Sequence, residues 1–361
     1  MSDVAELKRY VGVHARGQRI KGADAILRRI STDGPGTPGS WVYEWSQVAA
    51  GLEQRGRLLD AARHYAMARF PYADGEARQE ALDRCVGAVD QWRTGHEIIR
   101  LDAELPGGRV SSWATGLSRI QRRPLVLMTG GIVTVKEQLV PVLSAYRAFG
   151  LAAVATEMPG AGENTMRYDA DSWRMFPGLL DAIAARAEVN DVYLVALSFS
   201  GHLALRWAAE DTRVKGIVTV GAPVREFFTS AGWQAAVPGV TRGTLAHLTG
   251  VEPDRLFAEL KPMALDEGQL TAVRCPVRYL KSDRDEIIPA EEAALLAGQV
   301  SDLEVAANDD VHASPGHLLA SQLWTLASLL RLAGVSDGRT AALGLALAGL
   351  RARGSLRRQP R

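Results

Sequence analysis

The sequence predicts an α/β protein: a mostly parallel sheet with helices on both faces, preceded by an all-helical N-terminal domain and interrupted by a long insertion. Apolar strand-like runs alternate with helical segments from residue 124 onward, and residues 40–95 show three helical periods in succession. The stretch LVALSFSGHLALRWAA, residues 194–209, passes from a strand directly into a helix. Alternation of this kind is typical of a parallel sheet covered on both faces.

Residues 1–95 are predicted to form the helical domain. Apolar residues recur at i, i+3, i+4 and i+7 in segments that begin at Trp45, Leu58 and Leu82, and a helical pattern also covers residues 3–30. The loop STDGPGTPGS separates these two parts, since glycine and proline interrupt helices. The helix pair resembles a tetratricopeptide unit, but no third copy follows, so a repeat array is not expected.

Residues 96–335 are predicted to form the sheet domain. Two strand-like segments meet at Pro106-Gly107-Gly108, which is a hairpin signal. Six apolar runs follow, which read PLVLMTGG, LAAVATEM, DVYLVALS, VKGIVTVGA, CPVRYLKS and LEVAAND. Continuous apolar runs fit strands that are buried on both faces of a parallel sheet, so the hairpin should form an antiparallel edge.

The fourth and fifth runs are separated by residues 223–272, which is too long for an ordinary connection. The aromatic residues of this insertion favour a lid over a site, although they can equally belong to the core; they are Phe227, Phe228, Trp233 and Phe257. Residues 336–361 are predicted to form a helix packed on the body and a solvated basic tail. Contact of this tail with a membrane surface or a partner is the alternative.

The charge balance argues against a nucleic-acid partner. Lys and Arg number 42 against 41 Asp and Glu, a net charge of +1, so no overall basic field attracts a polyanion. The start MSDVAELKRY has no apolar signal core, and no apolar run is long enough to span a bilayer. Cys85 and Cys275 show no metal-ligand spacing. We therefore expect a cytoplasmic protein without cofactor, metal, nucleic acid or membrane, and any homodimer is expected to form through the helical domain.

The strand-to-helix turn at Ser198 carries the strongest functional signal. Such a turn brings strand and helix close together, so small residues must stand two positions before and after a nucleophile at its tip. Around Ser198 these are Ala196 and Ser200, whereas Ser200 would place the larger His202 there. Ser198 is therefore the better candidate nucleophile. The alternative is a buried strand whose serines cap the following helix.

A serine nucleophile needs a base, which is itself oriented by an acid. Hydrolases with this strand-to-helix turn place serine, acid and histidine in that chain order. The run CPVRYLKS leads into DRDEIIP, and LEVAAN leads into DDVHASPGH, so the order is satisfied at the carboxyl ends of two later strands. The candidate acids are Asp283, Asp285 and Glu286, and the candidate bases are His312 and His317. The other histidines lie in or near the helical domain or in helical contexts: His14, His64, His96, His202 and His247.

Acyl transfer also requires N–H donors aimed at a developing oxyanion. One candidate is the backbone amide of Phe199, and others are expected in MTGGIVTVKE at Gly130, Gly131 and Ile132. Glycine at these positions lets the backbone approach the substrate closely. Phosphate binding is the rival interpretation of the glycine pair, but the surrounding residues match neither the dinucleotide pattern nor the P-loop pattern.

Five segments together resemble a known family. They are LVLMTGGIVTVKEQ, EMPGAGE, ALSFSGHLAL, CPVRYLKSDRDEIIP and NDDVHASPGH, in this order behind a helical domain. The set is similar to the α/β hydrolases related to 2,6-dihydroxypseudooxynicotine hydrolase, the fermentation-respiration switch proteins and the polyketide-shortening hydrolases of pigment pathways. The resemblance covers about residues 40–335 and implies the α/β-hydrolase fold.

By this resemblance Ser198 matches the nucleophile, Asp285 the acid and His312 the base, while Gly130 and Gly131 match the glycine pair of the oxyanion loop. The segment EMPGAGE matches a loop beside the site. The residues expected to line the substrate pocket are Glu157, Phe227, Phe228 and Trp233.

The resemblance implies a serine-dependent hydrolase whose helical domain covers the active site. Several members cleave a carbon–carbon bond beside a ketone, a retro-Claisen step, and others act on esters; both reactions pass through a tetrahedral oxyanion. We therefore expect a neutral carbonyl substrate such as an acyl-phenol, a β-diketone or an aromatic polyketide intermediate, with esterase or thioesterase/cyclase activity as the alternative. Ala196, Ser200 and Ser282 stand where the family often has glycine. A non-catalytic binding protein of the same fold is the alternative from a different class.

Overall fold

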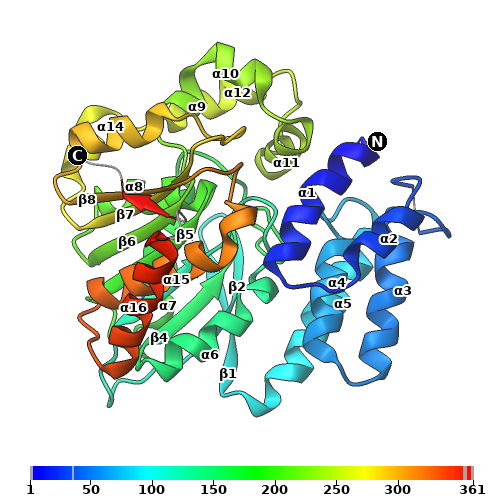
Figure 1. The fold of residues 1–361 in the computed structure, drawn as a ribbon, viewed down its shortest axis with the longest axis horizontal. Helices are drawn as coiled ribbons and strands as arrows, with labels where there is room; N and C mark the ends of the chain where they lie inside the picture. The colour runs from blue at the N-terminus through cyan, green and yellow to red at the C-terminus, as the bar shows by residue number, and fades with distance from the viewer. Residues whose placement is uncertain (1–2, 35, 353–355, 359–361) are drawn as a thin grey trace.

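A sheet of nine strands forms the centre of the computed structural model, which describes residues 3–34, 36–352 and 356–358 (Figure 1). The strand order is β1-β2-β4-β3-β5-β6-β7-β8-β9. Neighbours from β4 to β8 pair in parallel, whereas the β1-β2 hairpin and β9 pair antiparallel at the two edges. The strands are β1 Ile98–Leu105, β2 Gly108–Thr115, β3 Leu125–Thr129, β4 Ala152–Thr156, β5 Val192–Leu197, β6 Val214–Val220, β7 Val277–Ser282, β8 Leu303–Asn308 and β9 Arg357–Arg358.

The mostly parallel α/β fold predicted from the sequence is confirmed. Each of the six apolar runs contains a strand, and the hairpin turns at Pro106-Gly107, as its sequence indicates. All five residues of β3 and all five of β4 are buried, which explains why these strands read as continuous apolar runs. Strand β9 was not predicted, because its two arginines were assigned to a solvated tail.

Five helices make up the N-terminal helical region, which lies to one side of the sheet (blue in Figure 1). They are α1 Val4–Gly17, α2 Ala23–Arg29, α3 Trp41–Gln54, α4 Leu58–Ala68 and α5 Glu76–Trp92. The fully buried rings of Trp41 and Trp45 lie on one face of α3, and the Trp41 Nε1–H donates to the carbonyl of Met67 at 2.9 Å. Apolar residues at helical spacing thus bury one stripe of each helix.

Helices cover both faces of the sheet. Helices α8 and α15 both contact β5 and β6, and since the inner residues of these strands are buried, the two helices pack on opposite faces. The covering helices are α6 Val140–Ala148, α7 Met175–Ile183, α8 Phe199–Ala208, α14 Glu291–Gln299 and α15 Leu318–Leu332, and α16 Gly338–Ala352 packs on α15. Short 3₁₀ helices are η1 Arg93–Gly95, η2 Lys136–Gln138, η3 Ser172–Arg174, η4 Lys261–Met263 and η5 Pro315–His317.

The insertion between β6 and β7 is helical and meets the N-terminal region. Its helices are α9 Glu226–Thr229, α10 Ala231–Ala236, α11 Gly239–Thr249, α12 Leu256–Leu260 and α13 Glu267–Ala272. In Figure 1 it lies above the sheet, with α11 beside α1. The Val240 N–H donates to the Glu6 carboxylate at 3.1 Å, and the Tyr72 and His247 rings stack at 4.1 Å. The insertion and the helical region therefore enclose the same side of the sheet.

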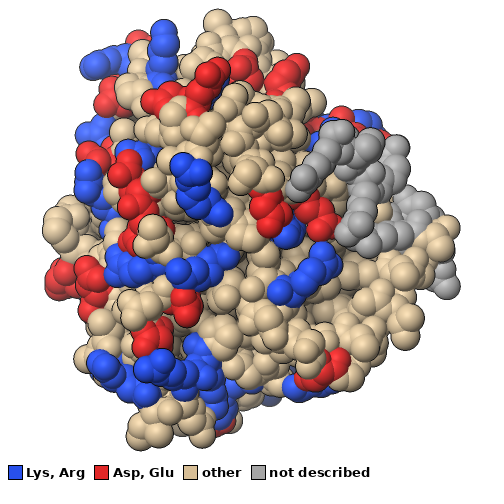
Figure 2. Space-filling model, turned by 90° about the vertical axis from the view of Figure 1, so that its left-hand side faces the viewer, with Lys and Arg blue, Asp and Glu red and all other residues tan. Residues whose placement is uncertain are grey.

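At the C-terminus, α16 packs on α15 and β9 pairs with Ala306 and Ala307 of β8. Residues 353–355 and 359–361 of the predicted basic tail lie outside the described residues. None of the helices in the described ranges is long and apolar enough to cross a bilayer. Figure 2 shows basic and acidic side chains intermixed on one face of the molecule, so the charges there do not gather into a field of one sign.

Candidate active site

Ser198 lies at the tip of a sharp turn between β5 and α8. Its backbone dihedrals, φ 58° and ψ −129°, lie outside the regions that residues other than glycine ordinarily adopt. The Ser198 N–H donates to the carbonyl of Val220 at 2.7 Å, which fastens the turn to the end of β6. A Cβ at Gly201 would overlap the side chain of Thr219, so glycine is required there for α8 to pack close to β6.

The neighbouring Ser200 is already engaged. Its Oγ lies 3.0 Å from the carbonyl oxygens of Thr129 and Leu197, to which its O–H can donate, and the residue is fully buried. Ser200 therefore acts as the small neighbour that the turn requires, and its hydroxyl joins α8 to the end of β3.

His312 and Asp285 complete a hydrogen-bonded chain with Ser198, which we call the triad. The Ser198 Oγ lies 3.0 Å from His312 Nε2, and His312 Nδ1 lies 2.8 Å from the Asp285 carboxylate. The same carboxylate accepts the N–H groups of Ile287 and Ile288 at 2.9 and 2.8 Å. Because Nδ1–H donates to Asp285, Nε2 is free to accept the serine proton.

The other candidate acids and the second candidate base have different partners. Glu286 accepts the backbone N–H of His312 at 3.0 Å, and Asp283 pairs with Lys281 at 3.1 Å. His317 pairs with Asp310 at 3.1 Å. Of the alternatives that the sequence left open, the structure thus brings Asp285 and His312 to Ser198.

Gly221 lies directly against the imidazole–carboxylate pair. Its φ is +59°, and a Cβ there would lie 3.0 Å from His312 Cε1 and 3.4 Å from the Asp285 Oδ2. Any larger residue would push the ring away. Sequence reasoning missed Gly221, although its position at the end of a predicted strand was the signal that could have identified it.

The loop after β3, residues 130–135, which we call the oxyanion loop, lies beside Ser198. A Cβ at Gly131 would be 3.1 Å from the Ser198 Cβ, and one at Gly130 would overlap the side chain of Thr134. Phe199 is the first residue of α8, and the first N–H groups of a helix have no hydrogen-bond partner within it. The Phe199 N–H, directly after the serine, and the Ile132 N–H, directly after Gly131, are therefore the candidate donors.

The charges around His312 favour its protonated form. Burial, the largest contribution, favours the neutral ring, but the charge and hydrogen bond of Asp285 together with the charge of Glu286 raise the pKa of His312. The site can therefore stabilise an imidazolium formed when the serine proton is transferred.

A buried ion network follows the oxyanion loop. The Lys136 ammonium lies 2.9 Å from Glu137, 3.2 Å from Glu157 and 2.7 Å from Glu163. The Lys136 N–H also donates to Glu157 at 3.0 Å. Burial, aided by the charge of Glu137, raises the pKa of Glu157 to about 7 against the opposing charge of Lys136. Three carboxylates around one ammonium thus fasten the end of the loop to the core.

Glu157 does not line a pocket as predicted. The residue is fully buried, and a Cβ at Gly162 would overlap its carboxylate. The segment EMPGAGE wraps this carboxylate and delivers the N–H of Glu163 to it at 2.7 Å. The sequence indicates that Glu157 lies beside the site. It does not show that the ammonium and the backbone N–H of Lys136 both bind the Glu157 carboxylate in the core.

The predicted pocket aromatics divide into two groups. Phe227 and Phe228 are fully buried, and Phe227 packs edge-on against Phe199 at 5.0 Å, so both rings belong to the core beneath the insertion. Trp233 is partly exposed, and its Nε1–H donates to the carbonyl of Ile287 at 2.8 Å. Trp233 thus joins the insertion to the loop that carries Asp285.

Two residues of α1 also lie near the triad, although no pattern in the sequence places them there. The Tyr10 hydroxyl faces Glu286, and burial together with the Glu286 charge raises the pKa of Tyr10. The His14 ring packs against Phe70 at 5.3 Å. Burial, with the charges of Arg69 and His312, lowers the pKa of His14 to about 4, so this ring is neutral at neutral pH.

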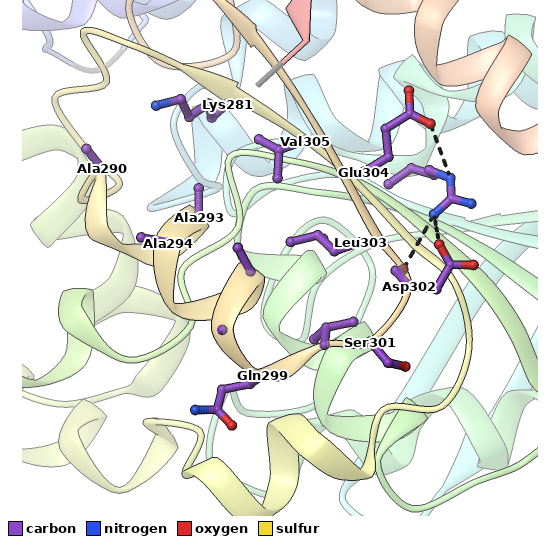
Figure 3. A pocket seen from close by; sticks show the side chains of 14 residues that line it. Lys281, Ala290, Ala293, Ala294, Gln299, Ser301, Asp302, Leu303, Glu304 and Val305 are labelled. Atoms are coloured by element: carbon purple, nitrogen blue, oxygen red, sulfur yellow. Dashed lines mark hydrogen bonds and ion pairs between the residues drawn. The ribbon is translucent and has the colours of Figure 1, made fainter. Parts of the chain in front are cut away.

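A separate groove of about 770 Å³ opens between β8 and α14 (Figure 3). One side carries Arg278, which pairs with Asp302 at 2.8 Å and Glu304 at 3.7 Å. Small side chains of α14 form the other side. The lining does not include any member of the triad.

Known proteins are similar to this chain over most of its length. A family model described as "FrsA-like: Esterase FrsA-like" matches residues 36–309. Esterase FrsA of Photorhabdus laumondii is 25% identical over 295 residues, which cover 74% of this chain and 71% of the relative. Esterase FrsA of Vibrio cholerae is 24% identical over 285 residues, covering 72% and 68%.

Solved structures are also similar. The structure named AbyA5 Wildtype shares 50% identity with a TM-score of 0.94 and covers 97% of this chain and 100% of that chain. The 2,6-dihydroxy-pseudo-oxynicotine hydrolase shares 17% identity with a TM-score of 0.71, covering 89% and 96%, and this likeness shows the fold alone.

The charge of Asp285 should set the pH dependence of activity. A base must be neutral to accept the serine proton, so kcat/KM should rise as pH increases through the His312 pKa, which lies above the usual value of about 6.5. Asp285→Asn removes the charge that raises this pKa, so the acidic limb should move to lower pH. The plateau should fall by on the order of 10⁴-fold. Asp310→Asn, beside His317, is the control; an acidic limb that stays in place in Asp285→Asn would contradict this account.

Lys136→Met should destabilise the fold strongly, because it leaves the buried carboxylates of Glu137 and Glu157 without their cation, whereas Glu163 keeps its pair with Arg100. Breaking a buried pair in this way costs about 3–5 kcal/mol in the free energy of unfolding, measured by urea denaturation. Arg57→Met removes the exposed pair with Asp60 and should cost less than about 1 kcal/mol. Equal losses in the two variants would show that the network does not stabilise the loop.

Proposed function

Because this chain belongs to the FrsA-like esterase family and is a hydrolase of the α/β-hydrolase fold, we propose that Ser198, His312 and Asp285 form its catalytic triad. The observation that carries the proposal is the continuous chain from Ser198 Oγ through the His312 ring to the Asp285 carboxylate, at 3.0 and 2.8 Å. It starts from a serine with strained backbone dihedrals, as expected for an exposed nucleophile.

The proposed reaction begins when His312 Nε2 takes the Ser198 proton and Oγ bonds to the substrate carbonyl carbon. The carbonyl oxygen then carries the negative charge and accepts N–H donors from Phe199 and from the oxyanion loop at Ile132. Protonated His312 delivers the proton to the leaving group as its bond to the carbonyl carbon breaks. Water, deprotonated by His312, then adds to the acyl carbon. His312 returns that proton to Ser198 Oγ as the Oγ–acyl bond breaks and the acid is released.

Ester cleavage is the reaction that the family favours, since its members carry the name esterase. Carbon–carbon cleavage of an acyl-phenol or β-diketone is the prediction from the sequence resemblance, and it uses the same three residues. The two reactions differ in one step: His312 protonates an oxygen in the first and a carbon in the second. A mostly apolar or aromatic carbonyl substrate fits both, and a thioester is handled in the same way as an ester.

Ser198→Ala should abolish turnover, and Ser200→Ala should retain most of it. Loss of a triad nucleophile typically lowers kcat by on the order of 10⁴ to 10⁶. Ser200→Ala only removes hydrogen bonds to Thr129 and Leu197, which are worth about 1 kcal/mol of stability each. Labelling by a fluorophosphonate probe should require Ser198 and persist in Ser200→Ala. Labelling that survives in Ser198→Ala would reject Ser198 as the nucleophile.

A comparison of matched substrates should identify the bond that is cleaved. We expect aryl esters and acyl thioesters to give higher kcat/KM values than acyl-phenols and β-diketones of equal size, because an oxygen or sulfur leaving group needs less help than a carbon. A preference of more than about tenfold corresponds to roughly 1.4 kcal/mol in the transition state. The reverse preference would assign carbon–carbon cleavage and leave the triad unaffected.

A further inference from the structure

We propose that Arg69, which belongs to the N-terminal helical region, is a positioning residue for the oxyanion loop, so that the helical region completes the catalytic centre as well as covering it. This assignment rests on the proposed triad. It concerns a residue that takes no part in the chain of proton transfer and lies on a different part of the fold.

Arg69 bridges the two parts of the molecule through one guanidinium group. It follows α4 and is only 2% exposed. Its Nη1–H donates to the carbonyl of Pro71 at 2.7 Å, within the helical region, and its Nη2–H donates to the carbonyl of Val133, within the oxyanion loop. The planar fork of an arginine can hold two such carbonyls at once.

The charge of Arg69 is not explained by an ion pair. Among the residues that the structure describes, no carboxylate forms an ion pair with this guanidinium, and its Nε has no hydrogen-bond partner. Burial lowers the pKa of Arg69 to about 10, so the group still carries its charge at neutral pH. A buried charge costs several kcal/mol in desolvation, and an apolar side chain could fill the same space at lower cost. What an apolar side chain could not do is hold the Val133 carbonyl.

That carbonyl belongs to the turn that presents the candidate oxyanion donor. Val133 directly follows Ile132, and the Thr134 N–H closes the turn onto the carbonyl of Gly131 at 3.0 Å. The Thr134 N–H shares a peptide unit with the Val133 carbonyl, and the Gly131 carbonyl shares one with the Ile132 N–H. Holding the Val133 carbonyl therefore fixes the orientation of the Ile132 N–H through the hydrogen bond that closes the turn. Glycines at 130 and 131 give this segment freedom to rotate when it is released.

The loop is anchored from two directions. On the core side, the Lys136 N–H donates to Glu157, and the Val135 N–H donates to Gln138 at 3.0 Å. On the other side, Arg69 supplies the contact from the helical region. Because oxyanion donors act only when they point at the developing charge, the second anchor should affect the transition state more than substrate binding.

Arg78 provides a matched control within the same region. It is 6% exposed, its Nε–H donates to the carbonyl of Phe70 at 3.2 Å, and it pairs with Asp33 and with Asp74. All of these partners lie in the helical region. Replacing Arg78 should therefore destabilise the helices without releasing the oxyanion loop.

The test compares Arg69→Met, Arg69→Lys and Arg78→Met with the unchanged protein, using phenyl acetate and a small trifluoromethyl ketone. Ser198 Oγ adds to the ketone carbon, the carbonyl oxygen becomes the oxyanion, and the proton passes to His312, so this inhibitor reports on the oxyanion donors directly. Arg69→Met should lower kcat by about 10²-fold, as displacements of about 1 Å commonly do, with little change in KM. Its affinity for the ketone should fall by the same factor.

Further measurements separate positioning from folding. Arg69→Lys should be intermediate, because one ammonium cannot reproduce both arms of the fork. In Arg69→Ala, added methylguanidinium should restore part of kcat, and sodium chloride at equal ionic strength should not. Arg78→Met should lower the melting temperature while its kcat and ketone affinity stay unchanged.

Three results would overturn the assignment. The first is that Arg69→Met and Arg78→Met show the same kcat and the same ketone affinity when equal fractions of each are folded. The second is that methylguanidinium restores no kcat to a folded Arg69→Ala. Either result would mean that Arg69 only stabilises the helical region. If the unchanged protein is neither labelled by a fluorophosphonate nor inhibited by the ketone, the proposed triad itself fails, and the role of Arg69 fails with it. The fluorophosphonate result on the unchanged protein therefore tells the two failures apart.

Discussion

The sharp turn at Ser198 is the constraint on which the rest of the site depends. A non-glycine residue with a φ of 58° is held at a cost of roughly 1–3 kcal/mol, and it persists only where the surroundings prevent relaxation. Here the surroundings are the hydrogen bond to Val220, the close packing of Gly201 on Thr219, and Gly131 beside the serine. These contacts come from the ends of two parallel strands, β6 and β3. The arrangement of parallel strands thus holds Ser198 in its strained backbone conformation.

Strand ends at the same edge of the sheet supply the remaining groups. Asp285 follows β7, His312 follows β8 and Gly221 follows β6, so the side chains converge because parallel strands finish at one edge of the sheet. Ser282 stands where the family resemblance implies a glycine. Its hydroxyl lies 2.9 Å from that of Ser314 and so connects the loop that carries Asp285 to the loop that carries His312. The departure therefore provides a contact between loops that a glycine would lack.

Local patterns in the sequence were sufficient for the strands, the helical region and the turn at Ser198, because burial on both faces produces continuous apolar runs. The order of serine, acid and histidine narrowed the candidates, while the choice of Asp285 over Glu286 came from the family resemblance. The contact of Arg69 with Val133 joins residues 64 positions apart and leaves no local pattern. The burial of Glu157 depends on Lys136 from another loop, and β9 is formed by arginines that local reasoning assigns to solvent.

The contact between Glu6 and the N–H of Val240 has a consequence for the order in which the protein assembles. These groups are 234 residues apart. A ribosome that adds roughly 5–20 residues per second needs about 12–47 seconds to span that distance. During this interval the nascent chain contains α1 but not α11. The face of α1 that contacts the insertion in the folded protein is therefore not yet packed against it. The packing of α1 against α11 is therefore a late event in synthesis, and it can take place only after the turn at Ser198 has been synthesised.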